Sequence, residues 1–370
     1  MGFFQLDRRL LYHFDWTVFA ITIAIAGIGL LTVVSASYGG PHRSLHPLVI
    51  RQIVWIAAGS LAMAAMVVFD YRALSTYAYP FYFAVLGMLV AVSVAGHAMG
   101  GSRRWIHLGL FTFEPSELAK LALILVMVRY LRDEPPRGGL RLRHIAVPGL
   151  LLLVPAGLVL KQPDLGTMLT LCLIFITLIF ASGLNLRTLL ILALGAMLAA
   201  PVGWHFLKPY QRQRVVSFMN PQSDPLGAGY HVIQSEIAVG AGGPWGKGFL
   251  QGTQSRLNFL PEQTTDFIFS VFAEEFGFAG AILLLSLYAA LVGRGLWIAR
   301  HARDRFGALL ALGLTAMIFW QSAINISMAT GLLPVVGIPL PLVSYGGSSL
   351  IALMASMGLL ISVNTRRYLF

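Results

Sequence analysis

The chain has 370 residues, of which 57% are hydrophobic and only 11% are charged. Soluble domains carry about 25% charged residues, so this composition excludes a soluble enzyme, a disordered chain and a fibrous protein. The net charge of +11 could indicate nucleic-acid binding, but in a membrane protein it more often reflects arginines in cytoplasmic loops. We therefore expect no nucleic-acid partner.

Ten apolar stretches are long enough to cross the roughly 30 Å hydrocarbon core of a membrane. They are residues 16–36, 49–69, 76–96, 115–131, 145–160, 167–183, 188–207, 266–293, 307–331 and 346–364. The first is longer than the roughly 7–15 residues of a signal-peptide core and is interpreted as an anchor. The pattern predicts an all-α polytopic membrane protein with about ten transmembrane helices, in one integral membrane domain over residues 1–370.

An even number of spans places both termini on the same side of the membrane. The short segments on that side are rich in arginine, so the positive-inside rule makes both termini cytoplasmic. The long segment between the seventh and eighth spans, residues 209–265, then forms an extracytoplasmic, periplasmic loop. Loops beyond about 15 residues are usually functional or disordered. Within this one, residues 228–239 have the pattern of an amphipathic helix.

Charged groups in or beside hydrocarbon usually face a cavity or a partner. Glu117 and Lys120 begin the fourth stretch three residues apart, so they share a helix face and can form an ion pair. That pair either fixes helix packing or lines a cavity. Glu274 and Glu275, in the eighth stretch, are predicted to have structural partners.

Asp266 lies where the long loop enters the eighth stretch. One interpretation is a helix cap formed by Thr264, Thr265 or Asp266. The other is a catalytic carboxylate whose pKa is raised by partial desolvation towards the range of a general base.

Two further features indicate a cavity near this loop. Residues 331–348 contain three prolines and cannot form a continuous helix, and irregular backbone at membrane depth occurs only where it lines a cavity. Seven cations fall outside, where they either meet a phosphate-bearing ligand or extend to lipid phosphates. They are Arg103, Arg104, Lys208, Arg212, Arg214, Lys247 and Arg256. These residues alone leave an enzyme and a transporter equally open.

Five sequence blocks resemble the SEDS family (shape, elongation, division and sporulation). They are residues 100–106, 115–120, 162–167, 261–262 with 265–269, and 339–347. The resemblance implies a ten-span glycosyltransferase of the bacterial inner membrane that polymerises lipid II. It also implies a class B penicillin-binding protein (a transpeptidase) and other membrane proteins of the elongation complex as partners, with membrane lipids around the chain. Segments of the long loop resemble the rod-shape members of the family more than the division members.

The resemblance carries over to individual residues. Asp266 matches the residue that the family needs for polymerisation, and Glu117 and Lys120 match its buried ion pair. Arg104, Trp105 and Asp164 match positions of its outer cavity. One position departs from the pattern: Thr264 stands where the family usually has His.

The implied chemistry is an inverting transfer. The GlcNAc 4-hydroxyl of lipid II attacks the anomeric carbon of a glycan carried on polyprenyl pyrophosphate, and Asp266 takes the hydroxyl proton. Cations would stabilise the leaving undecaprenyl pyrophosphate; the candidates are Arg104, Lys120, Arg212 and Arg214. A divalent cation, Mg²⁺ or Mn²⁺, is left open. The alternatives are a flippase or transporter of lipid II or another polyprenyl lipid, and a non-catalytic scaffold.

Overall fold

The computed structural model describes residues 13–38, 47–95, 97–99, 102–108, 111–133, 139–206, 209–219, 228–257, 259–260 and 262–367. Each of the ten predicted apolar stretches coincides with a helix. These helices are α2 (Trp16–Ala36), α3 (Pro47–Val68), α4 (Leu74–Ala95), α5 (Pro115–Leu131), α6 (Leu142–Lys161), α7 (Leu165–Ala181), α8 (Leu186–Phe206), α12 (Ile268–His301), α13 (Arg305–Ala329) and α14 (Gly347–Arg366). Among the described residues, seven helices are long and apolar enough to cross a membrane, and α7 is a shorter apolar helix. The chain is a multi-pass membrane protein.

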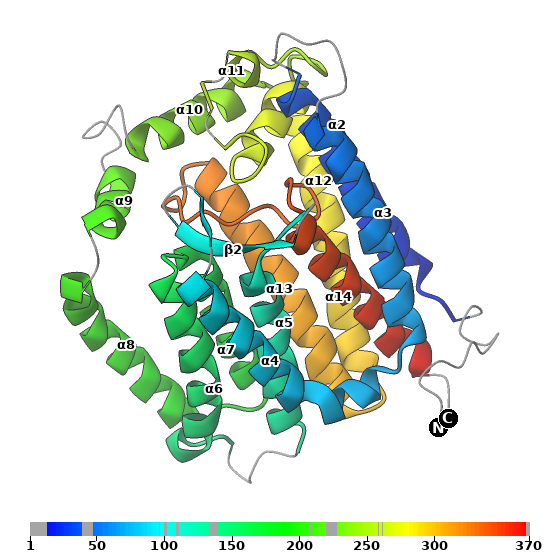
Figure 1. Ribbon diagram of the computed structural model, residues 1–370, viewed down its shortest axis with the longest axis vertical. Coiled ribbons are helices and arrows are strands. Elements are labelled where there is room, and N and C mark those ends of the chain that lie inside the picture. Colours follow the sequence, from blue (N-terminus) through cyan, green and yellow to red (C-terminus); the bar gives the residue numbers. More distant parts are fainter. Residues whose placement is uncertain are drawn as a thin grey trace.

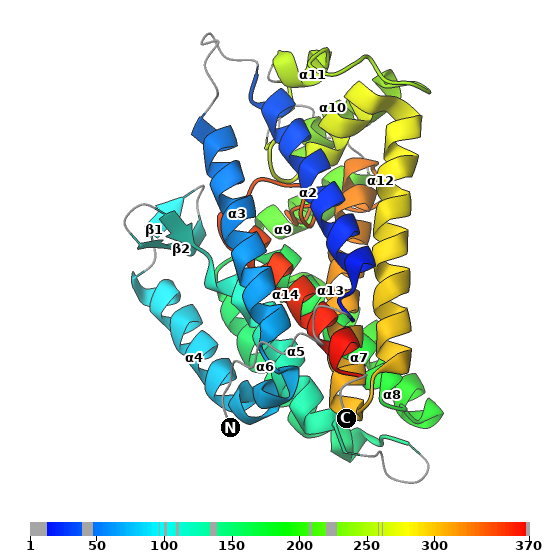
Figure 2. The ribbon, with the colours of Figure 1, turned by 90° about the vertical axis from the view of Figure 1, so that its right-hand side faces the viewer.

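The prediction of an all-α fold is wrong in one segment. Strands β1 (His97–Met99), β2 (Ser102–Leu108) and β3 (Phe111–Phe113) form an antiparallel sheet in the order β1-β2-β3 between α4 and α5. Trp, Ile and Phe favour strands, and glycines in the sequence between the strands favour turns. Figure 2 shows β1 and β2 beside one end of α4, at the edge of the bundle.

Helix α5 lies inside the bundle, where it packs against α4, α7 and α13 (Figure 1). Nearly all of its 17 residues are buried, including Glu117 and Lys120 near its N-terminus. Glu117 and Lys120 would be costly against lipid, so they favour an interior position for this helix. The two charged residues are thereby carried into the interior of the protein.

The described part of the long segment 209–265 forms the helices α9 (Pro209–Met219), α10 (Ala228–Ala241) and α11 (Thr253–Arg256). Helix α10 confirms the helix predicted over 228–239. It packs on α12, and Ser235 Oγ lies 2.6 Å from Ser270 Oγ and donates to Ala329 O. Helices α10 and α11 lie at the end of the bundle opposite the C-terminal end of α14 (Figures 1 and 2).

Helix α12 turns sharply at Gly277, which has φ 64° and ψ −163°. A Cβ at this position would lie 2.2 Å from Gly246 N, so only glycine fits this close approach. Just before the turn, Glu274 Oε1 lies 2.7 Å from Lys247 Nζ and accepts from Thr253 N. Glu275 accepts from the Ser35 hydroxyl. The prediction that both glutamates have structural partners is confirmed.

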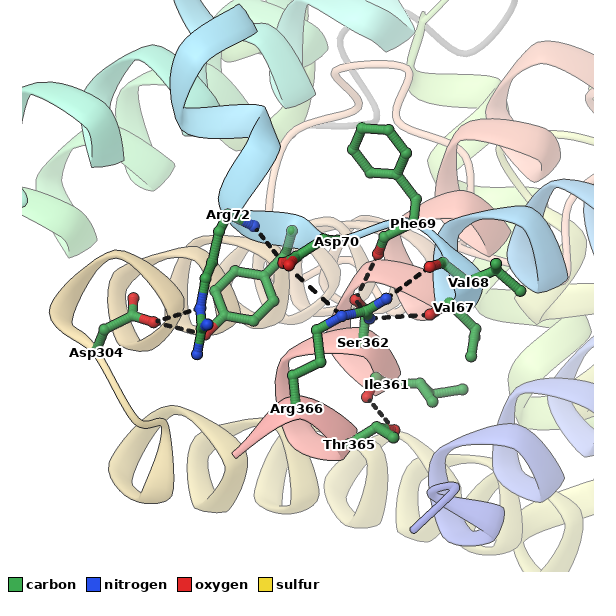
Figure 3. Close-up of polar contacts among 11 residues, drawn as sticks. Val67, Val68, Phe69, Asp70, Arg72, Asp304, Ile361, Ser362, Thr365 and Arg366 are labelled. Atoms are coloured by element: carbon green, nitrogen blue, oxygen red, sulfur yellow. Dashed lines mark hydrogen bonds and ion pairs between the residues drawn. The ribbon is translucent and has the colours of Figure 1, made fainter. Parts of the chain in front are cut away.

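Polar contacts join the helices at the opposite end of the bundle. Asp304, the N-cap of α13, lies 3.6 Å from Arg72 Nε. Arg366 of α14 donates to Val67 O and Val68 O, the last carbonyls of α3, and lies 3.8 Å from Asp70 (Figure 3). Arg366 thus satisfies carbonyls that a helix end leaves without intrahelical partners.

Candidate functional site

An irregular segment after α13 positions the backbone of Asp266. Helix α13 ends at Ala329 and α14 begins at Gly347, which confirms the predicted break over 331–348. Tyr345 N donates to Thr264 O at 2.9 Å, and Ser344 Oγ donates to Thr265 O at 2.6 Å. Asn325 Nδ2 bridges Asp266 O and Ile338 O, at 2.8 and 2.7 Å. The loop before α12 is therefore held against the loop before α14.

The side chain of Asp266 is not a helix cap. The N-cap of α12 is Phe267, and no side-chain cap hydrogen bond forms there. The side chain faces Gly337, where an added Cβ would come within 3.3 Å of Asp266 Oδ2. The capping interpretation is therefore wrong.

The electrostatic surroundings of Asp266 suit a general base. Burial, with a smaller contribution from Glu262, raises the pKa of Asp266 to about 6, although Arg214 and Arg104 oppose the rise. A base is most effective when its pKa lies near the working pH. At neutral pH this carboxylate is largely ionised and can accept a proton.

Arg104 and Asp164 form a second part of the site. Asp164 is 2% exposed and caps α7 by accepting from Thr167 N at 3.0 Å. Arg104 Nη1, on β2, lies 3.6 Å from Asp164 Oδ1, and its guanidinium also donates to Gln162 O and Pro163 O. Trp105 follows Arg104 on the strand, so its side chain points to the opposite face of the sheet.

Glu117 and Lys120 form the predicted ion pair, with Lys120 Nζ 2.8 Å from Glu117 Oε1. Their exposed fractions are only 5% and 2%. The second oxygen, Glu117 Oε2, is buried and has no hydrogen-bond partner among the described residues. The ion pair therefore uses only one of the two carboxylate oxygens of Glu117.

Glu114 is a site residue that the sequence reasoning missed. It occupies the N-cap position of α5 without capping it, and Glu114 Oε1 accepts from Ser116 Oγ at 2.8 Å. Burial, followed by Glu117 and Asp164, raises the pKa of Glu114 to about 8. The available signal was a second acidic residue just before Pro115, three positions from Glu117.

The cations on α9 complete the set of predicted residues. Arg214 is close enough to Asp266 to lower its pKa. Arg212 is two residues earlier, about 200° around the helix, so the two arginines face different directions. Asp164 raises the pKa values of both Glu114 and Asp266, so it lies close enough to both carboxyl groups to act on their charges.

No metal-ligand cluster occurs in the described part of the chain: no three His, Cys, Asp or Glu side chains converge there.

Similarity to known proteins defines the class. The chain belongs to the FTSW_RODA_SPOVE family, described as "Cell cycle protein", whose model matches residues 15–369. MrdB of Escherichia coli (strain K12), named a peptidoglycan glycosyltransferase, is 44% identical over 357 residues, or 96% of this chain and 94% of MrdB. RodA of Treponema pallidum (strain Nichols), with the same activity in its name, is 32% identical over 96% of this chain and 98% of its own length. The predicted resemblance is confirmed.

Solved structures share the fold. A chain in a structure described as "Structural coordination of polymerization and crosslinking by a peptidoglycan synthase complex" matches with a TM-score of 0.82 and 38% identity, covering 96% of this chain and 99% of that one. The crystal structure of the rod shape determining protein RodA from Thermus thermophilus matches with a TM-score of 0.71 and 32% identity, covering 96% and 98%.

Proposed function

We propose that this chain is a peptidoglycan glycosyltransferase that polymerises lipid II into glycan strands during cell elongation. The observation that carries the proposal is the partly buried carboxylate of Asp266. It does not cap α12, its pKa is raised, and two arginines act on its charge. It occurs in a chain 44% identical to MrdB over nearly its whole length. The scaffold alternative has no use for such a carboxylate.

In the proposed reaction, Asp266 takes the proton of the GlcNAc 4-hydroxyl as that oxygen attacks the anomeric carbon of the donor glycan. The new C–O bond forms while the bond to undecaprenyl pyrophosphate breaks, which inverts the anomeric centre. Pyrophosphate is already a good leaving group, so the protein must mainly stabilise its charge. Arg104, Arg214 and Arg212 would serve this role, because guanidinium groups bind phosphate oxygens bidentately. Lys120 is the fourth candidate.

The proposed membrane arrangement has ten spans, with both termini in the cytoplasm and the segment 209–265 outside the bacterial inner membrane. The site then lies at the outer boundary, where lipid-linked substrates can enter laterally between helices. The packing of α10 on α12 and the effect of Arg214, on α9, on the Asp266 carboxylate support this, because both bring segment 209–265 to the proposed site.

The proposed partner is a class B penicillin-binding protein that crosslinks the new strands, together with other membrane proteins of the elongation complex. The supporting observation is the 0.82 TM-score match to a chain from a complex described as coordinating polymerization and crosslinking. Lipid II and the surrounding membrane lipids are the remaining contacts.

The test uses the full chain purified with its transpeptidase partner and supplied with labelled lipid II. We expect a ladder of glycan products on a gel. Folded protein that makes no ladder but moves labelled lipid II across vesicle membranes would instead identify a transporter.

A further inference from the structure

Besides Glu262, the proposed site contains four carboxyl groups, and three of these four have a cation of their own. Glu117 pairs with Lys120, Asp164 pairs with Arg104, and Asp266 lies in the field of Arg214. Among the described residues, Glu114 forms no ion pair. If these four groups and Glu262 were all ionised, their five negative charges would exceed the four candidate cations of the site, which must also admit a pyrophosphate anion.

The surroundings of Glu114 give its anion little support. Ser116 Oγ donates one hydrogen bond. Ser348 Oγ on α14 accepts from Glu114 N, and it donates its own proton to Thr112 O on β3. That hydroxyl is therefore not available to the carboxyl group.

The charged groups that act on Glu114 come from two elements. Glu117 and Lys120 lie on α5, and Asp164 caps α7. Glu117 and Asp164 both disfavour the anion, and only Lys120 favours it. Burial is the largest influence, and it also favours the neutral acid.

A neutral Glu114 has a proton to donate, and its neighbour has an acceptor without a donor. Glu117 Oε2 is buried with no hydrogen-bond partner in the described part of the chain. Glu114 is the N-cap and Glu117 the third residue of α5, two positions that come close together at a helix start, and Glu117 acts directly on the charge of Glu114. A buried acceptor without a partner is costly, and a hydrogen bond from a carboxylic acid would remove that cost.

We propose, on the basis of the proposed polymerase function, that Glu114 is a positioning residue: as a neutral acid it donates to Glu117 Oε2 and keeps one negative charge out of the pyrophosphate site. The Glu117–Lys120 pair is then held in one geometry. The cations of the site remain available to an anionic substrate. Ionisation of Glu114 weakens binding of lipid II and leaves the chemical step at Asp266 unchanged.

The experiment measures KM for lipid II and kcat between about pH 6.5 and 9.5, with the full chain and its transpeptidase partner. The wild type is compared with Glu114→Gln, whose amide is neutral at every pH and can donate to Glu117. We expect the wild-type KM to rise about tenfold per pH unit above about pH 8, whereas the variant shows no such rise. Titration of the substrate is common to both proteins and cancels in the comparison.

Two further variants separate a charge effect from a packing effect. Glu114→Asp keeps a titratable acid and should retain the alkaline rise in KM. Glu236→Gln removes an exposed glutamate on α10 and should match the wild type at every pH. An alkaline rise of the same size in wild type and Glu114→Gln would overturn the proposal.

Infrared spectroscopy tests the proton without turnover. A protonated-carboxyl band should be present in the wild type at pH 7, disappear by about pH 9.5 and be missing from Glu114→Gln. Identical spectra for the two proteins would refute the neutral acid. No ladder from the wild type at any pH, with the band present, would contradict the polymerase function instead.

Discussion

Opposing influences set the protonation of Asp266. Burial and Glu262 raise its pKa, whereas Arg214 and Arg104 lower it, and the balance lies at about 6. A base works in its ionised form, so activity that depends on Asp266 should be complete above about pH 7 and fall as the pH decreases through 6.

Substituting Arg214 or Glu262 should shift the acidic limb of the pH profile, which is the fall in activity near pH 6, in opposite directions. Arg214→Gln removes a cation that stabilises the anion, so the apparent pKa in the kcat profile should rise. Glu262→Gln removes a negative charge, so it should fall. The measurement is the pH dependence of kcat for glycan synthesis, because the position of the limb does not depend on how tightly either variant binds substrate. Limbs that coincide for both variants and wild type would show that Asp266 does not control the profile.

The Glu117–Lys120 pair can serve packing, catalysis or both. Lys120→Met leaves Glu117 charged and buried without a cation, which should lower the free energy of unfolding by about 3–5 kcal/mol. The double variant Glu117→Gln with Lys120→Met should recover most of that loss, because no unpaired charge remains. We expect thermal unfolding to show this recovery while polymerisation stays low. If the double variant recovered both stability and polymerisation, the ion pair would serve helix packing alone.

At the scale of elements, the turn within α12 connects the site to the outer loop. Glu274 and Glu275 hold the loop over 247–253 on one side of Gly277, and the long helical arm continues on the other. The turn depends on a backbone conformation that residues with a Cβ rarely adopt.

Gly277→Ala should therefore destabilise the protein by at least about 2 kcal/mol, through strain and the close approach of Gly246. Gly293→Ala is the matched control, because Gly293 lies in the same helix with open space around it. That control should be neutral or more stable by up to about 1 kcal/mol. The measurement is thermal unfolding of the detergent-solubilised protein, and equal effects of the two substitutions would contradict this account of the turn.

At the scale of the whole molecule, the proposed orientation can be measured with single cysteines in a Cys172→Ser background. Trp245 is exposed beside α10, and Arg300 is exposed at the far end of α12. Trp245→Cys should react with an impermeant maleimide from the periplasmic side, and Arg300→Cys should react only after the inner membrane is opened. The reverse pattern would place the site in the cytoplasm and contradict the proposed function.

The helices could be predicted because apolar runs of about 20 residues have few alternatives in a membrane. The sheet formed by β1, β2 and β3 could not be predicted, because its strands are short and contain no long apolar run. Asp266, Glu117 and Lys120 were recognisable from local sequence. Their relation to Arg104, Asp164 and Glu114 was not, because it depends on contacts between β2, α5 and α7 that no local pattern encodes.

The most direct test of the account compares wild type with Asp266→Asn, in complex with the transpeptidase and at saturating labelled lipid II near pH 7.5. The amide keeps the size of the side chain but cannot accept the hydroxyl proton. We predict that the variant folds and binds lipid II like the wild type, and that glycan synthesis falls at least about a hundredfold. A ladder formed at near-normal rate by Asp266→Asn would contradict the role of Asp266 as the base.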